Sequence, residues 1–217
     1  WTASRSLLAE NTPYYSAGIQ FSHTTKDSTI YLAGLILNGW QRITRKGANQ
    51  LPAVGHQFKW TPNTKFTINS SSYIGNEYPE FQRRMRYFHN FYAKYERKQL
   101  GLIAGFDLGA EQRSYQSNYY GHWLCAILVA RKTFGDNLSA AVRGEYFYDK
   151  NGVIIPTEKD VPFSNIGLSC NVDYTFDFPL KIRLEYRSFY NERKYFTWGT
   201  KPTAVNHFVG IHLITHL

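Results

Sequence analysis

The chain has 217 residues and a mass of 25.2 kDa, carries a formal net charge of +9, and is 17% aromatic. This length allows one domain, which we take to span residues 1–217. No run of about 18 apolar residues occurs, which excludes a transmembrane helix, and the scattered Lys and Arg residues give no reason to expect a nucleic-acid partner.

Taken in order, the chain begins with an irregular stretch and continues as a series of strands. Residues Trp1–Pro13 show no clean period and predict a loop, with a short helical turn over Arg5–Glu10. About eleven strand-like segments follow, each of roughly nine to fourteen residues, close to the ~9–11 that cross a bilayer at a tilt. They are Tyr14–Thr24, Thr29–Leu37, Pro52–Trp60, Lys65–Ile74, Arg84–Tyr95, Leu100–Glu111, Tyr119–Lys132, Leu138–Tyr148, Ser164–Thr175, Leu180–Tyr190 and His207–Leu217.

The later segments show the clearest alternation of apolar and polar residues. In Leu180–Tyr190, the run LKIRLEYR places Leu, Ile, Leu and Tyr on one face and Lys, Arg, Glu and Arg on the other. A period of two is typical of a strand with one apolar and one polar face. Lipid accepts the apolar face and a wet lumen accepts the charged one. The pattern therefore predicts an all-β fold, a transmembrane antiparallel up-and-down β-barrel.

The connections between these segments alternate between short and long along the whole chain. Outer-membrane barrels have short periplasmic turns and longer external loops, so this order favours a membrane barrel over a soluble up-and-down barrel such as a lipocalin. The short turns are Thr25–Ser28, Thr61–Thr64, Glu96–Gln99, Thr133–Asn137 and Phe176–Pro179. The long connections are Asn38–Leu51, Gly75–Arg83, Gln112–Asn118, Asp149–Phe163 and Asn191–Asn206.

The strand directions suggest that part of the barrel lies outside this sequence. The first strand leads into a short turn and the last one leaves a long connection, so both run toward the periplasm. Two outermost strands of the same direction imply an odd strand number, whereas bacterial single-chain barrels have an even one. We therefore expect Trp1–Pro13 to be the end of an external loop, and the chain to be the C-terminal part of a larger even-stranded barrel.

Several stretches are distinctive enough to compare with a known family. They include WTASRSLLAENTPYYSAG at the start, RMRYFHNFYAKY at Arg84–Tyr95, GLIAGFDLG at Gly101–Gly109 and NVDYTFDFPLKIRLEYR at Asn171–Arg187. Together, and nearly end to end, they resemble the OmpL-like β-barrel porin family of Gram-negative outer membranes. The resemblance implies a porin in the outer membrane, without defined catalytic residues, and a long segment before the first residue given. The terminal ITHL departs from the aromatic end usual in barrels.

Charged side chains on the polar faces of three strands are the candidate functional residues. In a channel, charged side chains that line the lumen select solutes by sign. Basic residues outnumber acidic ones in this set, which gives the hypothesis of a passive channel for small hydrophilic solutes that favours anions modestly. The alternative is that Arg and Glu on neighbouring strands simply pair with one another. The candidates are Arg143, Glu145, Asp173, Lys181, Arg183, Glu185 and Arg187.

A second interpretation makes the barrel a structural subunit. In that case the lumen is plugged, and aromatic residues in the long connections contact other outer-membrane proteins of a larger complex. The candidates for such contacts are Tyr78, Phe81, Tyr195, Phe196 and Trp198. Both interpretations place the outer wall against membrane lipid.

We expect no enzymatic activity, cofactor or metal site. Neither a Ser-His-Asp order nor a G-x-S-x-G motif occurs. Asp149, Glu158 and Asp160 offer oxygens for a divalent cation, but their spacing matches no EF-hand, and a solvated loop explains them better.

Overall fold

The structure is one antiparallel sheet of eleven strands with almost no helix. The computed structural model describes residues 1–45, 47, 51–158 and 161–215. Beside the sheet lie a helical turn, α1 (Leu7–Glu10), a 3-10 turn, η1 (Glu80–Gln82), and a hairpin of β11 (Phe196–Trp198) and β12 (Lys201–Thr203). The sheet strands are β1 (Gly18–Thr24), β2 (Ile30–Leu37), β3 (Ala53–Asn63), β4 (Phe66–Asn76), β5 (Met85–Arg97), β6 (Leu100–Gln112), β7 (Tyr120–Phe134), β8 (Leu138–Asp149), β9 (Phe163–Thr175), β10 (Leu180–Tyr190) and β13 (Val205–Thr215). No helix among the described residues is long and apolar enough to cross a membrane.

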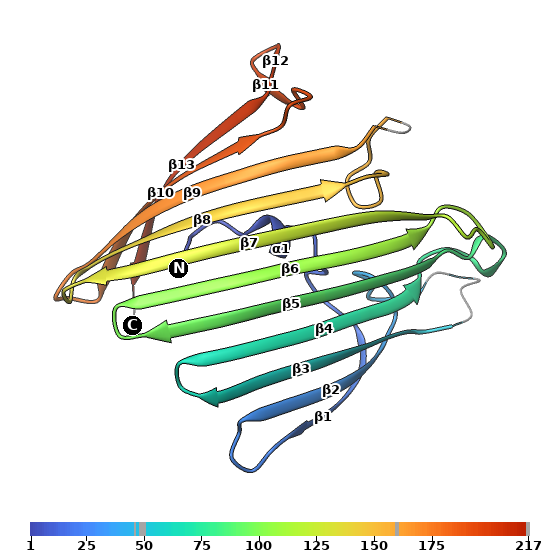
Figure 1. The fold of residues 1–217 in the computed structure, drawn as a ribbon, viewed down its shortest axis with the longest axis horizontal. Helices are drawn as coiled ribbons and strands as arrows, with labels where there is room; N and C mark the ends of the chain where they lie inside the picture. The colour runs from blue at the N-terminus through green and yellow to red at the C-terminus, as the bar shows by residue number, and fades with distance from the viewer. Residues whose placement is uncertain (46, 48–50, 159–160, 216–217) are drawn as a thin grey trace.

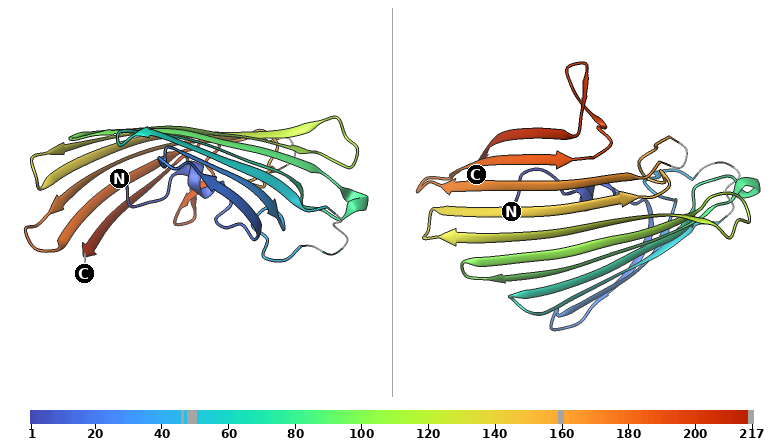
Figure 2. Two further views of the ribbon diagram at one scale, coloured as in Figure 1. Left: turned by 90° about the horizontal axis from the view of Figure 1, so that it is seen from below. Right: turned by 45° about the horizontal axis from the view of Figure 1, so that its top comes forward.

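Each strand pairs with its neighbour in the sequence, which gives an up-and-down sheet. The one apparent exception is β13, which pairs with β10 because the β11–β12 hairpin forms a separate small sheet. The large sheet is strongly arched, and the N-terminal segment with α1 lies under the arch (Figure 1, Figure 2). β1 and β13 are its two edges, and no pairing between them is found in the described part of the chain.

The bounds of the strands confirm the predicted alternation of short and long connections. Ser28, Lys98 and Gly135 take positive φ in three of the short turns, the conformation that lets a tight hairpin reverse the chain with a matching twist. Because the strands run up and down, the short turns gather at one end of the sheet and the long connections at the other.

The first strand is shorter than the sequence predicts. β1 begins at Gly18, so the first four residues of the predicted strand, from Tyr14 to Ala17, lie outside it. Tyr14 is held by the N-terminal segment instead, because its hydroxyl donates to Glu10 and the guanidinium of Arg5 lies 4.0 Å from its ring centroid. The expected helical turn between Arg5 and Glu10 is confirmed as α1.

The hairpin between β10 and β13 is not predicted by the sequence pattern. Its strands have three residues each, which is too few to show a period of two. Gly199 takes a φ of +60° in the turn between them, a conformation that glycine adopts without steric cost. Asn191–Asn206, predicted only as a long connection, therefore contains two short strands.

The outward face of the sheet is apolar and exposed, whereas the concave face of β8 to β10 is polar and covered. Val142, Leu168 and Leu184, on β8 to β10, are 57%, 62% and 49% exposed. Arg143 and Glu185, from the alternate row of the same strands, are 2% and 0% exposed. A sheet of a water-soluble protein buries its apolar face and exposes its polar one. Here the apolar face is exposed and the polar face buried, so the outward face is suited to contact with lipid.

Aromatic side chains mark both ends of the lipid-facing surface. Near the short turns, Trp60 and Phe66 form an edge-on pair with ring centroids 6.5 Å apart. Near the long connections, Tyr87 and Tyr120 lie 6.1 Å apart on the same outward face. Two such bands are typical of the aromatic girdles that sit at the two membrane interfaces.

Part of the concave face is filled by protein near the long connections. Tyr73, Phe88 and Trp123 point inward and are buried. Trp40, from the β2–β3 connection, folds against all three rings edge-on, with centroid distances of 5.0 to 6.3 Å. The guanidinium of Arg86 lies 5.1 Å from the Trp40 ring centroid. This end of the interior is therefore narrowed by a packed aromatic cluster.

Candidate functional site: the inner wall of the sheet

The structure places all seven predicted lumen-lining residues on the concave face, on β8, β9 and β10. They alternate with the exposed apolar row, as expected from the period of two. Five of them are buried, and two near the short turns are partly exposed. The buried ones are Arg143, Glu145, Asp173, Glu185 and Arg187, and the partly exposed ones are Lys181 and Arg183.

The central charges of this wall form a connected network of ion pairs. Arg143 lies 3.4 Å from both Glu145 and Glu185. Arg187, on β10, lies 2.6 Å from Glu145, on β8, and so forms a second link between these strands across β9. The side chains in these pairs are at most 8% exposed, so salt in the solvent screens them little. The acids and bases therefore neutralise one another within the wall.

A second ion pair lies closer to the short turns. Arg183 stands directly opposite Asp173 across β9 and β10, and donates to its two oxygens from Nε at 2.7 Å and Nη2 at 2.5 Å. Asn171 donates a further hydrogen bond of 2.9 Å to the same carboxylate. Lys181 forms no ion pair with any described residue, so the charge left uncompensated at this end is positive.

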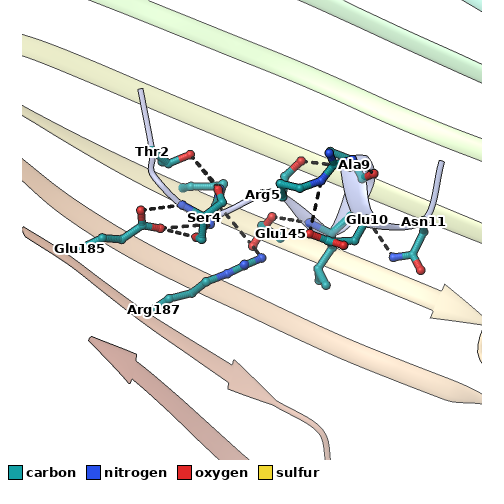
Figure 3. Close-up of polar contacts among 12 residues, drawn as sticks. Thr2, Ser4, Arg5, Ala9, Glu10, Asn11, Glu145, Glu185 and Arg187 are labelled. Carbon is teal, nitrogen blue, oxygen red and sulfur yellow. Dashed lines mark hydrogen bonds and ion pairs between the residues drawn. The ribbon is translucent and has the colours of Figure 1, made fainter. Parts of the chain in front are cut away.

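The N-terminal segment lies across this charged wall and is hydrogen-bonded to it. Glu185 accepts from the backbone nitrogens of Ala3 and Ser4, at 2.5 and 3.0 Å, and from the Ser4 hydroxyl. Glu145 accepts from the backbone nitrogen of Leu7 at 2.7 Å, just where α1 begins. Figure 3 shows both carboxylates reaching from the strands toward the segment. Two buried acids thus anchor a stretch of chain inside the arch.

Arg143 ties the same segment to the wall from the cationic side. Its Nη1 donates to the Thr2 hydroxyl and to the Ser4 carbonyl oxygen, each at 2.8 Å. Its Nη2 donates to the Ser4 hydroxyl at 2.8 Å. Burying a guanidinium is costly unless its donors find partners, and here the segment supplies several of them. The segment and the ion-pair network therefore stabilise each other.

Glycines on β6 give the segment room to approach the sheet. A Cβ at Gly101 would lie 2.5 Å from the Trp1 ring, and one at Gly105 would lie 3.4 Å from Leu8. The sequence pattern predicts a loop over Trp1–Pro13 but not its position on the concave face. The sequence GLIAGFDLG could have indicated this position, because Gly101, Gly105 and Gly109 recur every four residues on one strand face and glycine in a strand often marks a close approach of other chain.

The inner wall of β1 to β4 differs from that of β8 to β10 in its charge and in the exposure of its side chains. All residues of these four strands are described, and Lys59 is the only Asp, Glu, Lys or Arg among them. The inward positions near the short turns carry hydroxyl and amide side chains. Most of these positions are exposed or partly exposed, among them Gln20, Ser22, Thr24 and Gln57. The interior therefore has a charged, covered wall and an almost uncharged, open one.

The predicted loop aromatics do not form one patch. Phe81 and Trp198 are 69% and 77% exposed, but they belong to connections at distant positions in the sheet order, β4–β5 and β10–β13. Tyr78 lies under the guanidinium of Arg84, 4.6 Å from the ring centroid. The remaining two pack on neighbouring rings: Tyr195 on Phe163 and Phe196 on Phe189.

Asp149 has a structural part in its loop. Its two carboxylate oxygens accept from the backbone nitrogens of Asn151, Val153, Ile154 and Ile155, at 2.7 to 3.2 Å. These donors use up the oxygens that a cation would need, so Asp149 does not contribute to a cation site. Asp160 lies outside the described residues. Within the described part of the chain, no group of three or more His, Cys, Asp or Glu side chains is placed to hold a metal ion.

The fold and the inner wall together define an outer-membrane β-barrel protein. Its outward face is apolar and carries aromatic bands, its inner face is polar, and its connections alternate between short and long. The chain belongs to the family "Putative beta-barrel porin-2, OmpL-like", whose model matches residues 1–217. The protein is therefore located in the bacterial outer membrane, with its outer wall against lipid.

A solved structure shows the same fold at low sequence identity. It is OmpT, folded in vitro, an outer membrane protein of Vibrio cholerae, and it is 7% identical to the chain with a TM-score of 0.62. The similarity covers 90% of the chain and 62% of that structure, so the chain spans less than two thirds of its length. No curated protein matches the chain in sequence.

Proposed function

We propose that the protein is a passive channel for small hydrophilic solutes, narrowed by the N-terminal segment. The observation that carries the proposal is the polar inner wall with a segment of chain anchored across it. Membership of a porin family supports it. The segment occupies one side of the interior, which leaves the β1–β4 side for solutes. No step of this function needs a catalytic residue or a cofactor.

We further propose a modest preference for anions. The acids of the charged wall are paired with Arg, so they contribute little net field to the interior. Lys59 and Lys181 face inward and form no ion pair with a described residue. A ring or row of unpaired cations favours anions in a pore. Of the seven charged candidates, Arg143, Glu145 and Glu185 then hold the segment, and Lys181 is the member that acts on solutes.

The complete barrel contains more strands than this chain, in our proposal. β1 and β13 run in the same direction, because β1 enters a short turn and β13 leaves a long connection. An antiparallel closure between them needs an odd number of further strands, which makes the total even. The OmpT structure, of which the chain matches 62%, agrees with a longer protein.

The test of the channel is single-channel conductance of the full-length protein in a planar bilayer. We expect stable current steps that grow with KCl concentration, and a reversal potential in a KCl gradient that favours chloride modestly. Absence of conductance from a folded, heat-modifiable barrel would contradict the channel, and a reversal potential that favours potassium would contradict the anion preference.

A scaffolding function is the second candidate, and two observations favour it. The aromatic cluster around Trp40 and the anchored segment both fill space inside the arch. Phe81 and Trp198 are large, exposed and external, as a partner contact requires. If the folded barrel conducts no current, replacing Phe81 and Trp198 with Ser should release outer-membrane proteins that co-purify with it. Unchanged co-purification would argue against scaffolding.

A further inference from the structure

We infer that the inner wall of β1 to β3 holds a binding subsite for a hydroxylated monocarboxylate, such as a sugar acid. This inference names a solute class and rests on the channel function proposed above. The first observation that supports it is which inner side chains a solute in the lumen can reach. A solute cannot reach Arg143 or Glu185, because the N-terminal segment covers them, but it can reach the side chains of β1 to β4.

A pocket of about 470 Å³ opens on this accessible wall near the short turns. Its volume falls within the ~300–1,000 Å³ of small-molecule sites. The side chains around it come from β1, β2, β3 and the turn between β1 and β2. They are Thr24, Ser28, Thr29, Tyr31, Gln57, Lys59 and Thr61.

The pocket has one cation and no acid on the strands that flank it. Lys59 stands between Tyr31 on β2 and Asn69 on β4, both uncharged. Asp27 lies in the turn between Thr24 and Thr29, which border the pocket, and its carboxylate accepts hydrogen bonds from Thr25 and Thr29. The Lys59 ammonium is therefore available to a carboxylate, and a second negative charge on the solute would find no partner here.

The other groups of the pocket suit hydroxyls. The hydroxyls of Thr24 and Thr61 and the carbonyl oxygen of Gln57 have no hydrogen-bond partner among the described residues, so each can bind a solute hydroxyl. Gln57 is oriented by a 3.0 Å hydrogen bond from its amide nitrogen to Asn69. Tyr31 adds an aromatic ring whose hydroxyl accepts from Gln20 at 2.9 Å, which fixes the ring beside the pocket.

The experiment compares two probes of similar size, D-galacturonate and its neutral counterpart D-galactose. Each is added to full-length protein in a planar bilayer at constant KCl, and the concentration that halves the current is measured for both. In the wild type we expect galacturonate to block at the lower concentration. Lys59→Gln should raise its half-blocking concentration about fivefold, the effect of one exposed charge, and leave galactose unchanged.

Two further variants make the result specific. Lys59→Arg keeps the charge and should retain the block. Lys65→Gln removes an exposed lysine from the turn between β3 and β4, outside the pocket, and should leave both probes unchanged. An equal effect of Lys59→Gln and Lys65→Gln would overturn the subsite, and so would a Lys59→Gln channel that galacturonate blocks as before.

A binding measurement that needs no ion current distinguishes failure of the subsite from failure of the channel. Saturation-transfer NMR on the refolded protein in micelles reports galacturonate contact whether or not the channel conducts. Loss of that signal in Lys59→Gln supports the subsite. Wild-type conductance without any galacturonate signal or block overturns the subsite alone, whereas a folded wild type that does not conduct overturns the channel.

Discussion

The two inner walls of this sheet obey the same alternation and use it differently. On β8 to β10, the inward row is charged, paired and covered by the N-terminal segment. On β1 to β4, the inward row is almost uncharged and open, with Lys59 as the one fixed charge. The comparison teaches that a charged inner row is not by itself a selectivity filter. In the channel proposed above, where these charges neutralise one another and hold a segment, we expect the accessible wall to decide which solutes pass.

The largest expected effect comes from removing the acid that anchors the segment. Glu185→Ala deletes the acceptor for three hydrogen bonds from Ala3 and Ser4 and leaves Arg143 without one of its acids. Breaking a buried ion pair from one side costs about 3–5 kcal/mol, so we expect a clear fall in the urea midpoint. Released from the wall, the segment should also obstruct less, and single-channel conductance should rise.

The matched control for Glu185→Ala is Ser22→Ala on the open wall. Ser22 is exposed on β1 and makes no hydrogen bond through its side chain with any described residue. We expect wild-type stability and conductance from it. Similar conductance changes in both variants would show that the two walls do not differ as described.

A smaller effect is expected from filling the glycine groove of β6. In Gly101→Leu, the new side chain occupies the place of the Trp1 ring, since even a Cβ would lie 2.5 Å from it. If the Trp1 ring stays in place, this overpacking should lower the free energy of unfolding by about 1–3 kcal/mol. If the Trp1 end of the segment is displaced instead, single-channel conductance should rise. Gly34→Leu is the control, because nothing lies within 4 Å of its Cβ and it faces lipid. Equal urea midpoints and conductances for the two variants would argue against the groove.

The smallest effect concerns the turn beside the open wall. The Thr25 hydroxyl, followed by the backbone and hydroxyl of Thr29, holds the pKa of Asp27 below its usual value. A carboxyl with a lowered folded-state pKa stabilises the fold above its unfolded pKa of about 3.9, and this contribution is lost as the pH falls through the lower folded value. Asp27→Asn should therefore lower the urea midpoint slightly at pH 7. The difference should disappear in acid, and a difference that persists below pH 3 would contradict the assignment.

The sequence predicted which residues face inward, but not their ion-pair partners or the segment that covers them. The run LKIRLEYR was enough to place Arg183 and Glu185 on the polar face, because parity along a strand follows from the backbone alone. Partners such as Asp173 and Arg183 depend on register across two strands, which the period does not give. The inward fold of Trp1–Pro13 depends on tertiary contacts with residues far along the chain, and no local pattern encodes them.

Single cysteines at matched positions on the two inner walls distinguish an open wall from a covered one. Ser22→Cys and Ser169→Cys are made separately in a chain whose own cysteines, Cys125 and Cys170, are replaced by Ala. A charged, membrane-impermeant thiol reagent is then applied to the folded protein in liposomes. Ser22 is exposed on the inner face of β1 and Ser169 is 6% exposed on the inner face of β9. We predict rapid labelling at position 22 and little at position 169, and equal labelling rates would contradict the account of one open and one covered wall.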